Sequence, residues 1–509
     1  MNSLPSAFDA PSSALEQWAE RWCASVEIEP RVIVTRGEGT HLVEIGHRFP
    51  SALILSWTDR ESQREHRRVL EPSRDRLATV LIRALALGVE IYTANPPQAL
   101  LEGSPTFADL DALSAELRSE ARVEMGTTRL LGPLLLDNLA ENIEDLLENT
   151  LSISRVHGLV ADRPILVVGA GPSLGPFAKE LVSWRERVFI IAATSALRPL
   201  QEVGITPDVA VIIEPRECLH HFEGISEDTL SNLTLAVESS THPSHLRLPV
   251  ARRIHFHGVA GQWLAPLSGE GSCVPSGGNV GTTMLVLAWM LGGWPVLIAG
   301  LDFAMQGNRY YTEKCGSRRV RVPEERTEAI AGWGHRRLRA TSELVSYRRQ
   351  SEQILGVIRR RDPKARFLML TLEGARIEGV TPVDWRRLVP ELPRLAPDML
   401  SERLARIRSG IDWTGIAGVE KRFERYFNCL HEMEGDDAGI FEGYVLSRSK
   451  HKILEMLILP RILERRARGH FGEPTAADFD AARKWIRGMR EQIRAYVGRR
   501  VTARVSSVP

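Results

Sequence analysis

Between residues 165 and 237, short uninterrupted apolar runs alternate with segments whose apolar residues recur at helical spacing. Apolar runs without polar interruption are typical of strands that are buried on both faces, as in a parallel sheet. Their alternation with helices indicates right-handed crossovers and a doubly wound, Rossmann-like α/β domain, which we place at residues 132–395. The strands are predicted at residues 165–168, 188–192, 209–213 and 233–237, and the helices between them at 177–184 and 197–203.

The segment before this domain has a pattern of its own. Residues 30–56 alternate short β-rich runs with Gly and Pro turns, and residues 79–93 continue with a helix pattern followed by a strand pattern. This predicts a small α/β domain over residues 1–131. From Gly132 to about Val156, apolar residues recur at helical spacing among acidic residues and asparagines, which predicts a connecting helix.

After Pro397 the pattern changes to long charged segments in which apolar residues recur at helical period. Three amphipathic helices are predicted, at residues 416–433, 445–468 and 476–497. Together they form a predicted helical domain over residues 396–509. Pro460 lies in the middle helix and is expected to kink it or to divide it in two, because proline has no backbone N–H to donate.

One stretch, residues 280–301, carries no charge and is about long enough to cross a bilayer. The sequence Gly292-Gly293-Trp294-Pro295 interrupts it between a helix pattern and a strand pattern. Glycine and proline together are strong turn signals. We therefore predict a buried helix, a turn and a buried strand here, and no membrane span.

The composition narrows the class of protein. Of the 509 residues, 43% are hydrophobic and 25% are charged, which is typical of a folded protein of two or three domains. The formal net charge of +1 gives no overall attraction to nucleic acid or to an anionic membrane surface, so a phosphate must be held by a local site. The five cysteines form no C-x-x-C pair, which indicates a reducing compartment. The first residues lack the pattern of a secretory signal, and we expect a cytoplasmic protein.

The sharpest local feature is the sequence ILVVGAGPSL at residues 165–174, an apolar strand that runs into a glycine turn and then a helix. Glycines permit close approaches that other residues do not, and amides at a helix start point toward an anion. We predict that Gly169, Gly171, Pro172, Ser173 and Leu174 hold a phosphate, and the alternative is a turn required only for packing. Pro172, and Leu174 in place of the third glycine of the dinucleotide fingerprint, argue against a nicotinamide site.

Polar residues follow the later strands as well. Thr194 and Ser195 come after the second strand, and Glu214 ends the third. Because the carboxyl ends of strands in a doubly wound sheet converge on one crevice, we assign all three to the binding site. Glu214 is interpreted as a ligand for a ribose hydroxyl or a metal, or as a cap of the next helix. Asp302 follows the strand pattern at residues 296–299 and is assigned to the catalytic set, with an Asx-type turn as the alternative.

A second loop of small residues precedes the uncharged helix. Its residues Ser276, Gly277, Gly278 and Asn279 offer amides and hydroxyls near a helix start, which suit contact with a phosphate or a sugar, and a merely tight turn is the alternative. Further on, His335 is a candidate general base, because an imidazole titrates near neutral pH.

At these residues the sequence resembles the motility-accessory glycosyltransferases that modify bacterial flagellin, which share a domain with the archaeal hydroxymethyl-dihydropterin diphosphokinases. The resemblance spans roughly residues 139–380. The residues that carry it are Asn138 and Asn142, the turn at 169–174, residues 205–208, Glu214 and Pro215, residues 300–303, Tyr310 and residues 373–377. Glu214 stands where the family usually has Asp, so a carboxylate is kept with a longer reach.

A more distant resemblance is to bacterial sialyltransferases that use a CMP-linked donor and carry the same Gly-x-Gly-Pro-Ser-Leu turn. It implies that Ser276 and Gly277 contact the CMP portion. It also implies that Tyr310 steadies the departing phosphate and that His335 deprotonates the acceptor hydroxyl. A second tyrosine, expected two residues after Asp302, is Ala304 here.

These resemblances imply an enzyme that transfers a nonulosonic acid, of the pseudaminic or legionaminic type, from its CMP ester to Ser or Thr hydroxyls of flagellin. The helical C-terminal domain is then a candidate surface for the acceptor. A second hypothesis is diphosphate transfer from ATP to hydroxymethyl-dihydropterin, with magnesium held by acids such as Glu214 and Asp302. A third is a motility accessory protein that binds without turnover, which Ala304 favours.

Overall fold

The computed structural model describes most of the chain, in two compact units. The described residues are 14–27, 30, 32–36, 40–50, 52–57, 69–70, 74–87, 89, 91–96, 110–161, 163–275, 278–316, 327–394, 403–404, 407, 412–434, 452–468 and 474–506. One unit comprises Met1–Pro133 and Glu424–Arg494, and the other comprises Leu134–Phe423 and Ala495–Pro509. The first unit joins segments from both ends of the chain, which the sequence analysis assigns to two separate domains.

A four-stranded sheet organises the N-terminal part of the first unit. Its strands are all parallel and follow the order β3-β2-β1-β4. The elements are α1 (Ala14–Ala24), β1 (Val32–Arg36), α2 (Thr40–Arg48), β2 (Leu53–Trp57), β3 (Val69–Leu70), α3 (Arg74–Ala86) and β4 (Ile91–Ala94). Ile33 and Ile54 from adjacent strands pack with Ile45 of α2 in its core.

Three long helices follow the central domain along the chain: α14 (Ile416–Glu434), α16 (Lys452–Ala467) and α17 (Ala476–Ser506). The helical C-terminal region is therefore confirmed. Pro460 lies inside the continuous helix α16, so the predicted division into two helices does not occur. Leu459 beside it is buried against Ile82 and Ala86 of α3, and this packing compensates for the backbone hydrogen bond that proline removes.

The connecting helix begins much earlier than predicted. Helix α4 spans Leu110–Asn149 and contains Pro133. The predicted start at Gly132 is wrong, because the helix continues through this residue and Gly132 serves close packing. A Cβ at this position would lie 3.4 Å from the main-chain oxygen of Met456 in α16. Burial of apolar residues along the helix thus overrides the low helix propensity of the Gly-Pro pair.

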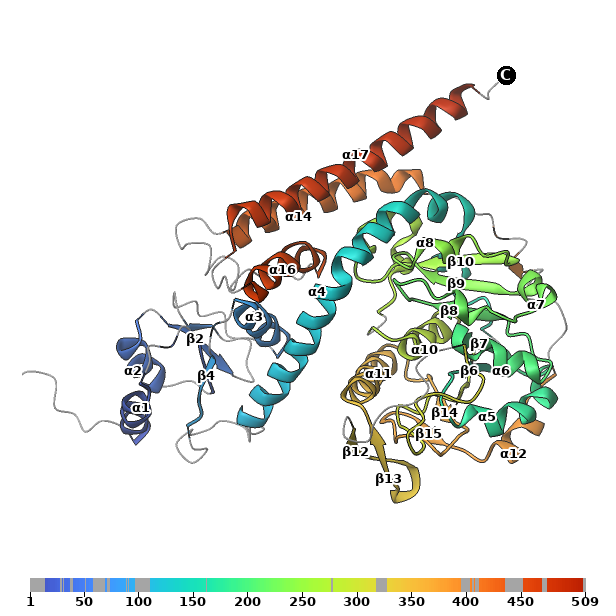
Figure 1. Ribbon diagram of the computed structural model, residues 1–509, viewed down its shortest axis with the longest axis horizontal. Coiled ribbons are helices and arrows are strands. Elements are labelled where there is room, and N and C mark those ends of the chain that lie inside the picture. The colour runs from blue at the N-terminus through green and yellow to red at the C-terminus, as the bar shows by residue number, and fades with distance from the viewer. Residues whose placement is uncertain are drawn as a thin grey trace, which may run out of the picture. The chain divides into compact units, whose positions relative to one another are not determined.

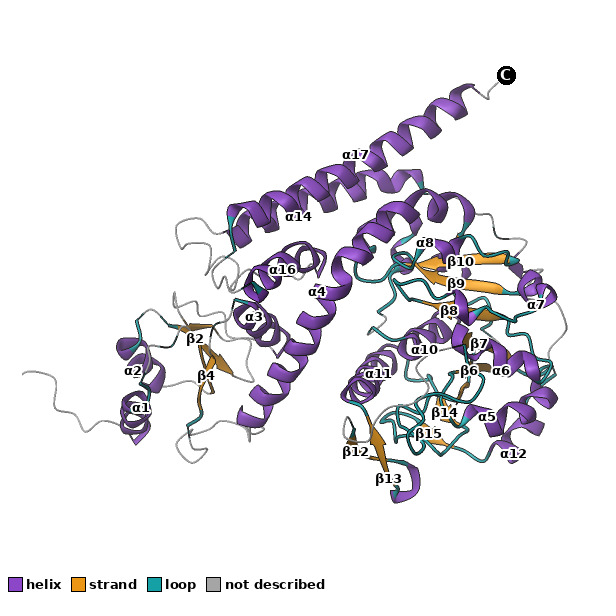
Figure 2. Ribbon diagram, viewed as in Figure 1, coloured by secondary structure: helices purple, strands orange, loops and turns teal. Residues whose placement is uncertain are grey.

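The second unit is built on a nine-stranded parallel sheet with the order β15-β14-β11-β6-β7-β8-β9-β10-β5. Figure 2 shows strands of this sheet, such as β8, β9 and β10, in orange. Every pair of neighbouring strands is parallel. The strands are β5 (Leu151–Ser152), β6 (Ile165–Val168), β7 (Phe189–Ala193), β8 (Val209–Ile212), β9 (Thr234–Glu238), β10 (Arg252–Phe256), β11 (Val296–Ala299), β14 (Phe367–Met369) and β15 (Thr381–Pro382). The predicted doubly wound α/β domain is confirmed.

Helices cover both faces of this sheet (Figure 1). Ile165 and Val167 of β6 point to one face, where they pack with α10 (Val280–Leu291) and α11 (Ser342–Arg361). Leu166 and Val168 point to the other face, toward α5 (Leu174–Phe177), the 3-10 helix η3 (Ala178–Trp184) and α6 (Leu197–Glu202). The strands are continuous apolar runs because both of their faces are buried.

The uncharged stretch forms a buried helix, a turn and a strand, as predicted. Helix α10 ends at Gly292, whose φ of 82° is the left-handed conformation typical of a helix C-terminus. The cis Trp294–Pro295 bond leads into β11. None of the helices that the structure describes is long and apolar enough to cross a membrane.

Candidate functional site

A cavity of about 250 Å³ lies where the strand order of the large sheet reverses. The chain proceeds from β6 through β7 and β8 to one side, whereas β11 pairs with the opposite edge of β6. Crevices at such a reversal, outside the carboxyl ends of the strands, are the usual ligand sites of doubly wound folds. The predicted site residues that line the cavity are Gly169, Gly171, Thr194, Ser195, Glu214, Gly278, Asn279, Asp302 and Tyr310.

The glycine turn after β6 packs directly against the loop that follows β11. The amide of Gly169 donates to the carbonyl oxygen of Ala299 at 2.9 Å, and the amide of Gly171 donates to that of Gly300 at 2.8 Å. A Cβ on Gly171 would lie 2.6 Å from Gly300 O and 2.7 Å from Cγ of Asp302. Both glycines are therefore required by the close approach of two backbone segments.

Ser173 directs its polar groups to Asp302. Its amide donates to Oδ2 at 2.7 Å and its hydroxyl donates to Oδ1 at 2.5 Å. Burial raises the pKa of Asp302 to about 6, although both hydrogen bonds from Ser173 oppose this rise. Because both carboxylate oxygens already accept hydrogen bonds from the protein, Asp302 holds the two loops together.

These contacts engage most of the amides of the glycine turn. The amides of Gly169, Gly171 and Ser173 donate within the protein, and that of Leu174 donates to Gly171 O at 3.0 Å. Pro172 has no N–H, and the helix that begins at Leu174 has only four residues. Pro172, Ser173 and Leu174 are buried and are not among the cavity-lining residues. The turn thus shapes the wall of the cavity, which Ala170 also lines, and its contact with a phosphate stays a prediction.

The second strand end contributes hydroxyls and brings in a histidine that the sequence analysis did not identify. Thr194 and Ser195 begin a short 3-10 turn after β7 and line the cavity. Thr194 Oγ1 lies 3.0 Å from Nδ1 of His221, which also lines the cavity. Burial lowers the pKa of His221 to about 4, so its ring is neutral at pH 7. No sequence signal connects His221 to the cavity, because it is placed there by a 3-10 helix of only three residues, η5 (Leu219–His221).

Glu214, at the end of β8, is half-buried at the cavity, and burial raises the pKa of its carboxyl group. Its carbonyl oxygen accepts hydrogen bonds from the amide of His242 at 3.1 Å and from Thr241 Oγ1 at 3.0 Å. The loops after β8 and β9 are therefore joined directly behind this wall of the cavity.

Two buried asparagines of α4 hold the same loops. Asn142 donates to the carbonyl oxygens of Ser239 at 3.1 Å and Thr241 at 2.7 Å. Asn138 donates to the carbonyl oxygens of Pro215 at 2.7 Å and Ser240 at 3.2 Å. These residues carry part of the family resemblance, and their position shows what they do: they fix the backbone beside Glu214.

We expect Asn142→Ala to lower the free energy of unfolding by about 1–3 kcal/mol, because two buried carbonyl groups lose their donors. Urea denaturation of the full chain measures the change. The exposed Asn149, which donates only to Asp145 of its own helix, supplies the control Asn149→Ala, with an expected change within about 0.5 kcal/mol. Equal effects of the two substitutions would contradict this account of Asn142.

The small-residue loop before α10 is seen only in part. Asn279 caps this helix, since its Oδ1 accepts from the amide of Thr282 at 2.8 Å, and Gly278 has a left-handed φ of 71°. Both residues line the cavity. Ser276 and Gly277 lie outside the described residues, so their contact with a donor stays a prediction.

Aromatic residues close the cavity on the side of α11. Tyr310 is 6% exposed, and its ring centroid lies 4.7 Å from that of Tyr311. Ala304 lines the cavity at the position where a second tyrosine was expected, but Tyr347 enters the same cavity from α11. The Tyr347 hydroxyl donates to Oε1 of Glu343 at 2.9 Å, and burial, followed by the charge of Glu343, raises its pKa.

His335 is not among the cavity-lining residues. It lies exposed, with a left-handed φ of 63°, in the turn of the hairpin formed by β12 (Glu328–Ala331) and β13 (Arg337–Ala340). The hairpin is anchored beside the cavity, because the amide of Met305 donates to Arg339 O at 2.8 Å. The assignment of His335 as a base is therefore not supported by a contact in this structure and stays a prediction.

Comparisons with known proteins agree with this architecture. Residues 135–308 match the family described as 6-hydroxymethylpterin diphosphokinase MptE-like. An uncharacterized protein of Treponema pallidum (strain Nichols) is 28% identical over 260 residues, which cover 47% of this chain and 44% of the relative. The chain thus spans less than half the length of this relative.

A solved structure supports the likeness over nearly the whole chain. The MAf glycosyltransferase from Magnetospirillum magneticum AMB-1 superposes with a TM-score of 0.56 and 16% identity, covering 96% of this chain and 84% of that protein. At this level of identity the match establishes the shared fold. The resemblances to the MptE-like domain and to the motility-accessory glycosyltransferase fold are both confirmed.

Proposed function

We propose that the chain is a glycosyltransferase that moves a nonulosonic acid from its CMP ester to Ser or Thr hydroxyls of flagellin. The observation that carries the proposal is the cavity at the reversal of the strand order, with the hydroxyl groups of Thr194, Tyr310 and Tyr347 around it. The shared fold with a MAf glycosyltransferase supports the reaction class. The CMP donor and the flagellin acceptor rest on the sequence resemblances.

In this reaction the acceptor oxygen bonds to the anomeric carbon while the bond from that carbon to the CMP phosphate oxygen breaks. The leaving phosphate needs hydrogen-bond donors that are already in place. We assign this role to the side chain of Tyr310, which lines the cavity.

Tyr310→Phe is expected to reduce the transfer rate at saturating donor about tenfold, the effect of losing one hydrogen bond to the developing charge. CMP affinity should change less, because the charge on the leaving group is greatest during transfer. Assays of CMP release over time measure the transfer rate, and calorimetry measures the affinity for CMP. Tyr426→Phe, a buried tyrosine of α14 outside the cavity, serves as the control. An unchanged rate in Tyr310→Phe would remove Tyr310 from the mechanism.

His335 is proposed as the base that accepts the proton of the acceptor hydroxyl. The support is its exposed position on a hairpin that is anchored at Met305, where a protein acceptor has access from solvent. His335→Ala should slow transfer about 100-fold without affecting CMP binding. The exposed His157 offers a matched control in His157→Ala. Equal transfer rates in the two variants would exclude His335 as the base.

The family description of residues 135–308 favours a second candidate, ATP-dependent diphosphate transfer to hydroxymethyl-dihydropterin. One set of assays distinguishes the candidates. The purified chain is incubated with CMP-nonulosonic acids and unglycosylated flagellin, and separately with ATP and the pterin. Release of CMP with a matching increase in flagellin mass supports the glycosyltransferase, release of AMP supports the diphosphokinase, and release of neither supports a protein that only binds.

A further inference from the structure

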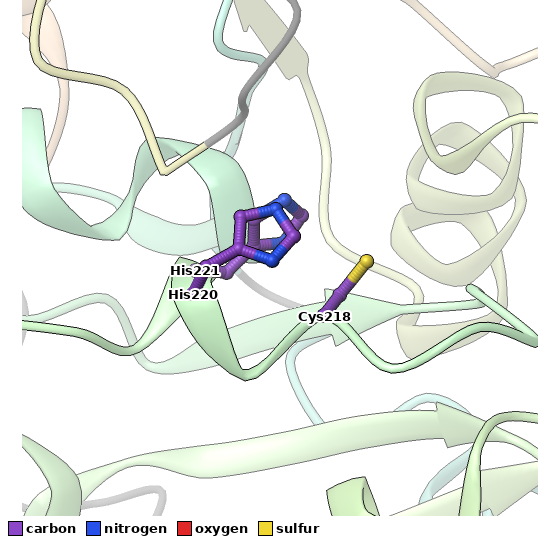
Figure 3. Close-up of side chains that lie close together, drawn as sticks. All are labelled: Cys218, His220 and His221. Atoms are coloured by element: carbon purple, nitrogen blue, oxygen red, sulfur yellow. The ribbon is translucent and has the colours of Figure 1, made fainter.

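A cluster of metal-ligating side chains lies at the edge of the cavity, in the loop that follows β8. Cys218, His220 and His221 each offer one ligand atom, and these three atoms lie within 4.8 Å of one another. Figure 3 shows the two imidazole rings beside each other, with the sulfur of Cys218 across from them. All three side chains are half-buried, so they remain accessible to an ion.

Hydrogen bonds hold this loop in place. The amide of His221 donates to the carbonyl oxygen of Cys218 at 3.0 Å, which closes the turn between them. The amide of Cys218 donates to Nε2 of the buried His245 at 3.1 Å. Behind the turn, Arg198 donates to the carbonyl oxygen of Glu223 at 2.6 Å. The main chain that carries the three ligands is therefore held in place by the protein itself.

A hydrogen bond also orients one of the imidazoles. Thr194 Oγ1 lies 3.0 Å from Nδ1 of His221, and Thr194 itself is only 3% exposed. A metal-bound histidine almost always has its other ring nitrogen held by such a partner, which fixes the ring and its tautomer. With Nδ1 bonded to Thr194, Nε2 is the nitrogen of His221 that is left for an ion.

We propose that Cys218, His220 and His221 bind a divalent transition metal ion, and that this ion is zinc. One thiolate and two imidazoles form a borderline-soft ligand set, which suits Zn²⁺ and is poor for Mg²⁺ or Ca²⁺, since these ions require oxygen ligands. Three protein ligands leave the fourth tetrahedral position to a water or a ligand oxygen, as in catalytic zinc sites. Because His221 also lines the cavity, this position belongs to the edge of the ligand site.

The test uses the full-length chain, first stripped of metal with a chelator and then titrated with Zn²⁺ or Co²⁺. We expect one equivalent of tightly bound zinc by elemental analysis. The cobalt form should show a thiolate-to-cobalt charge-transfer band and the visible bands of tetrahedral Co²⁺. Neither readout depends on transferase activity. The chain can therefore lack the metal site and still be a glycosyltransferase, or bind zinc without being one.

Four variants make the test specific. Cys218→Ser should abolish the charge-transfer band, and His220→Gln should weaken zinc binding with the band still detectable at high cobalt. Cys273→Ser removes another half-buried thiol and should leave both readouts unchanged. Thr194→Val should weaken zinc binding about tenfold, the usual effect of losing the partner of a ligating histidine. Circular dichroism confirms that each variant is folded. Failure of the wild-type chain to bind zinc, or a charge-transfer band that persists in Cys218→Ser, would overturn the proposal.

Discussion

Gly171→Ala is expected to abolish detectable CMP binding and to lower the free energy of unfolding by about 1–3 kcal/mol, the usual cost of overpacking. The added methyl group would lie 2.6 Å from Gly300 O, a main-chain atom, and 2.7 Å from Cγ of Asp302, which Ser173 holds through two hydrogen bonds. Both neighbours line the cavity, so relief of the clash must displace its wall. Calorimetry with CMP and urea denaturation of the full chain measure the two effects.

The matched control is Gly356→Ala, in helix α11 of the same unit. A Cβ there meets nothing closer than Nη1 of Arg360 at 3.5 Å, an ordinary contact. Alanine in a helix interior is favoured over glycine by about 0.5–1 kcal/mol, so this variant should gain stability and keep CMP binding. If Gly171→Ala binds CMP as the wild type does, the close approach of the two loops does not determine the shape of the site.

The second large effect is expected at Asp302. Asp302→Ala removes both acceptors of Ser173 and leaves a buried N–H without a partner, which costs about 1–3 kcal/mol. CMP binding should be lost together with the contact between the two loops. Asp302→Asn should retain both properties, because Oδ1 of Asn can accept from the Ser173 amide while Nδ2 donates to the Ser173 hydroxyl. Urea denaturation at pH 5 and calorimetry with CMP compare the two variants.

The same residue gives a pH dependence with a definite sign. Burial raises the folded-state pKa of Asp302 from 3.8 to about 6, so the folded protein binds this proton more tightly than the unfolded chain does. The resulting stabilisation is fully present below pH 3.8 and is lost as the pH rises through about 6. It amounts to about 3 kcal/mol. The stability of wild type relative to Asp302→Asn should therefore fall across this interval, and a constant difference would contradict the raised pKa.

The strands of the large sheet could be predicted from the sequence because burial on both faces leaves an unbroken apolar run. The start of α4 could not, since the packing of Gly132 against Met456 involves a residue far along the chain. Strand ends were equally informative: Thr194, Glu214 and Asp302 reach one cavity because parallel strands bring their carboxyl ends together.

The roles of these residues were harder to predict than their positions. From the sequence alone, the turn at Gly169 and Gly171 is interpreted as an anion site. Only the pairing of β6 with β11 shows that these two amides donate to the carbonyl oxygens of Ala299 and Gly300. Tyr347 and His221 were missed for a related reason. Each reaches the cavity from an element whose own pattern carries no mark of a ligand site.

The asparagines of α4 have a consequence for how specificity can change in this fold. Asn138 and Asn142 recognise carbonyl oxygens, which every amino acid possesses. The backbone path beside Glu214 is thus independent of which side chains occupy the loops. Substitutions at a loop position such as Glu214, which lines the cavity, can alter the chemistry presented there while the scaffold stays in register. Because these asparagines of α4 contact the main chain of the loops, the side chains of the loops can vary without loss of the contacts.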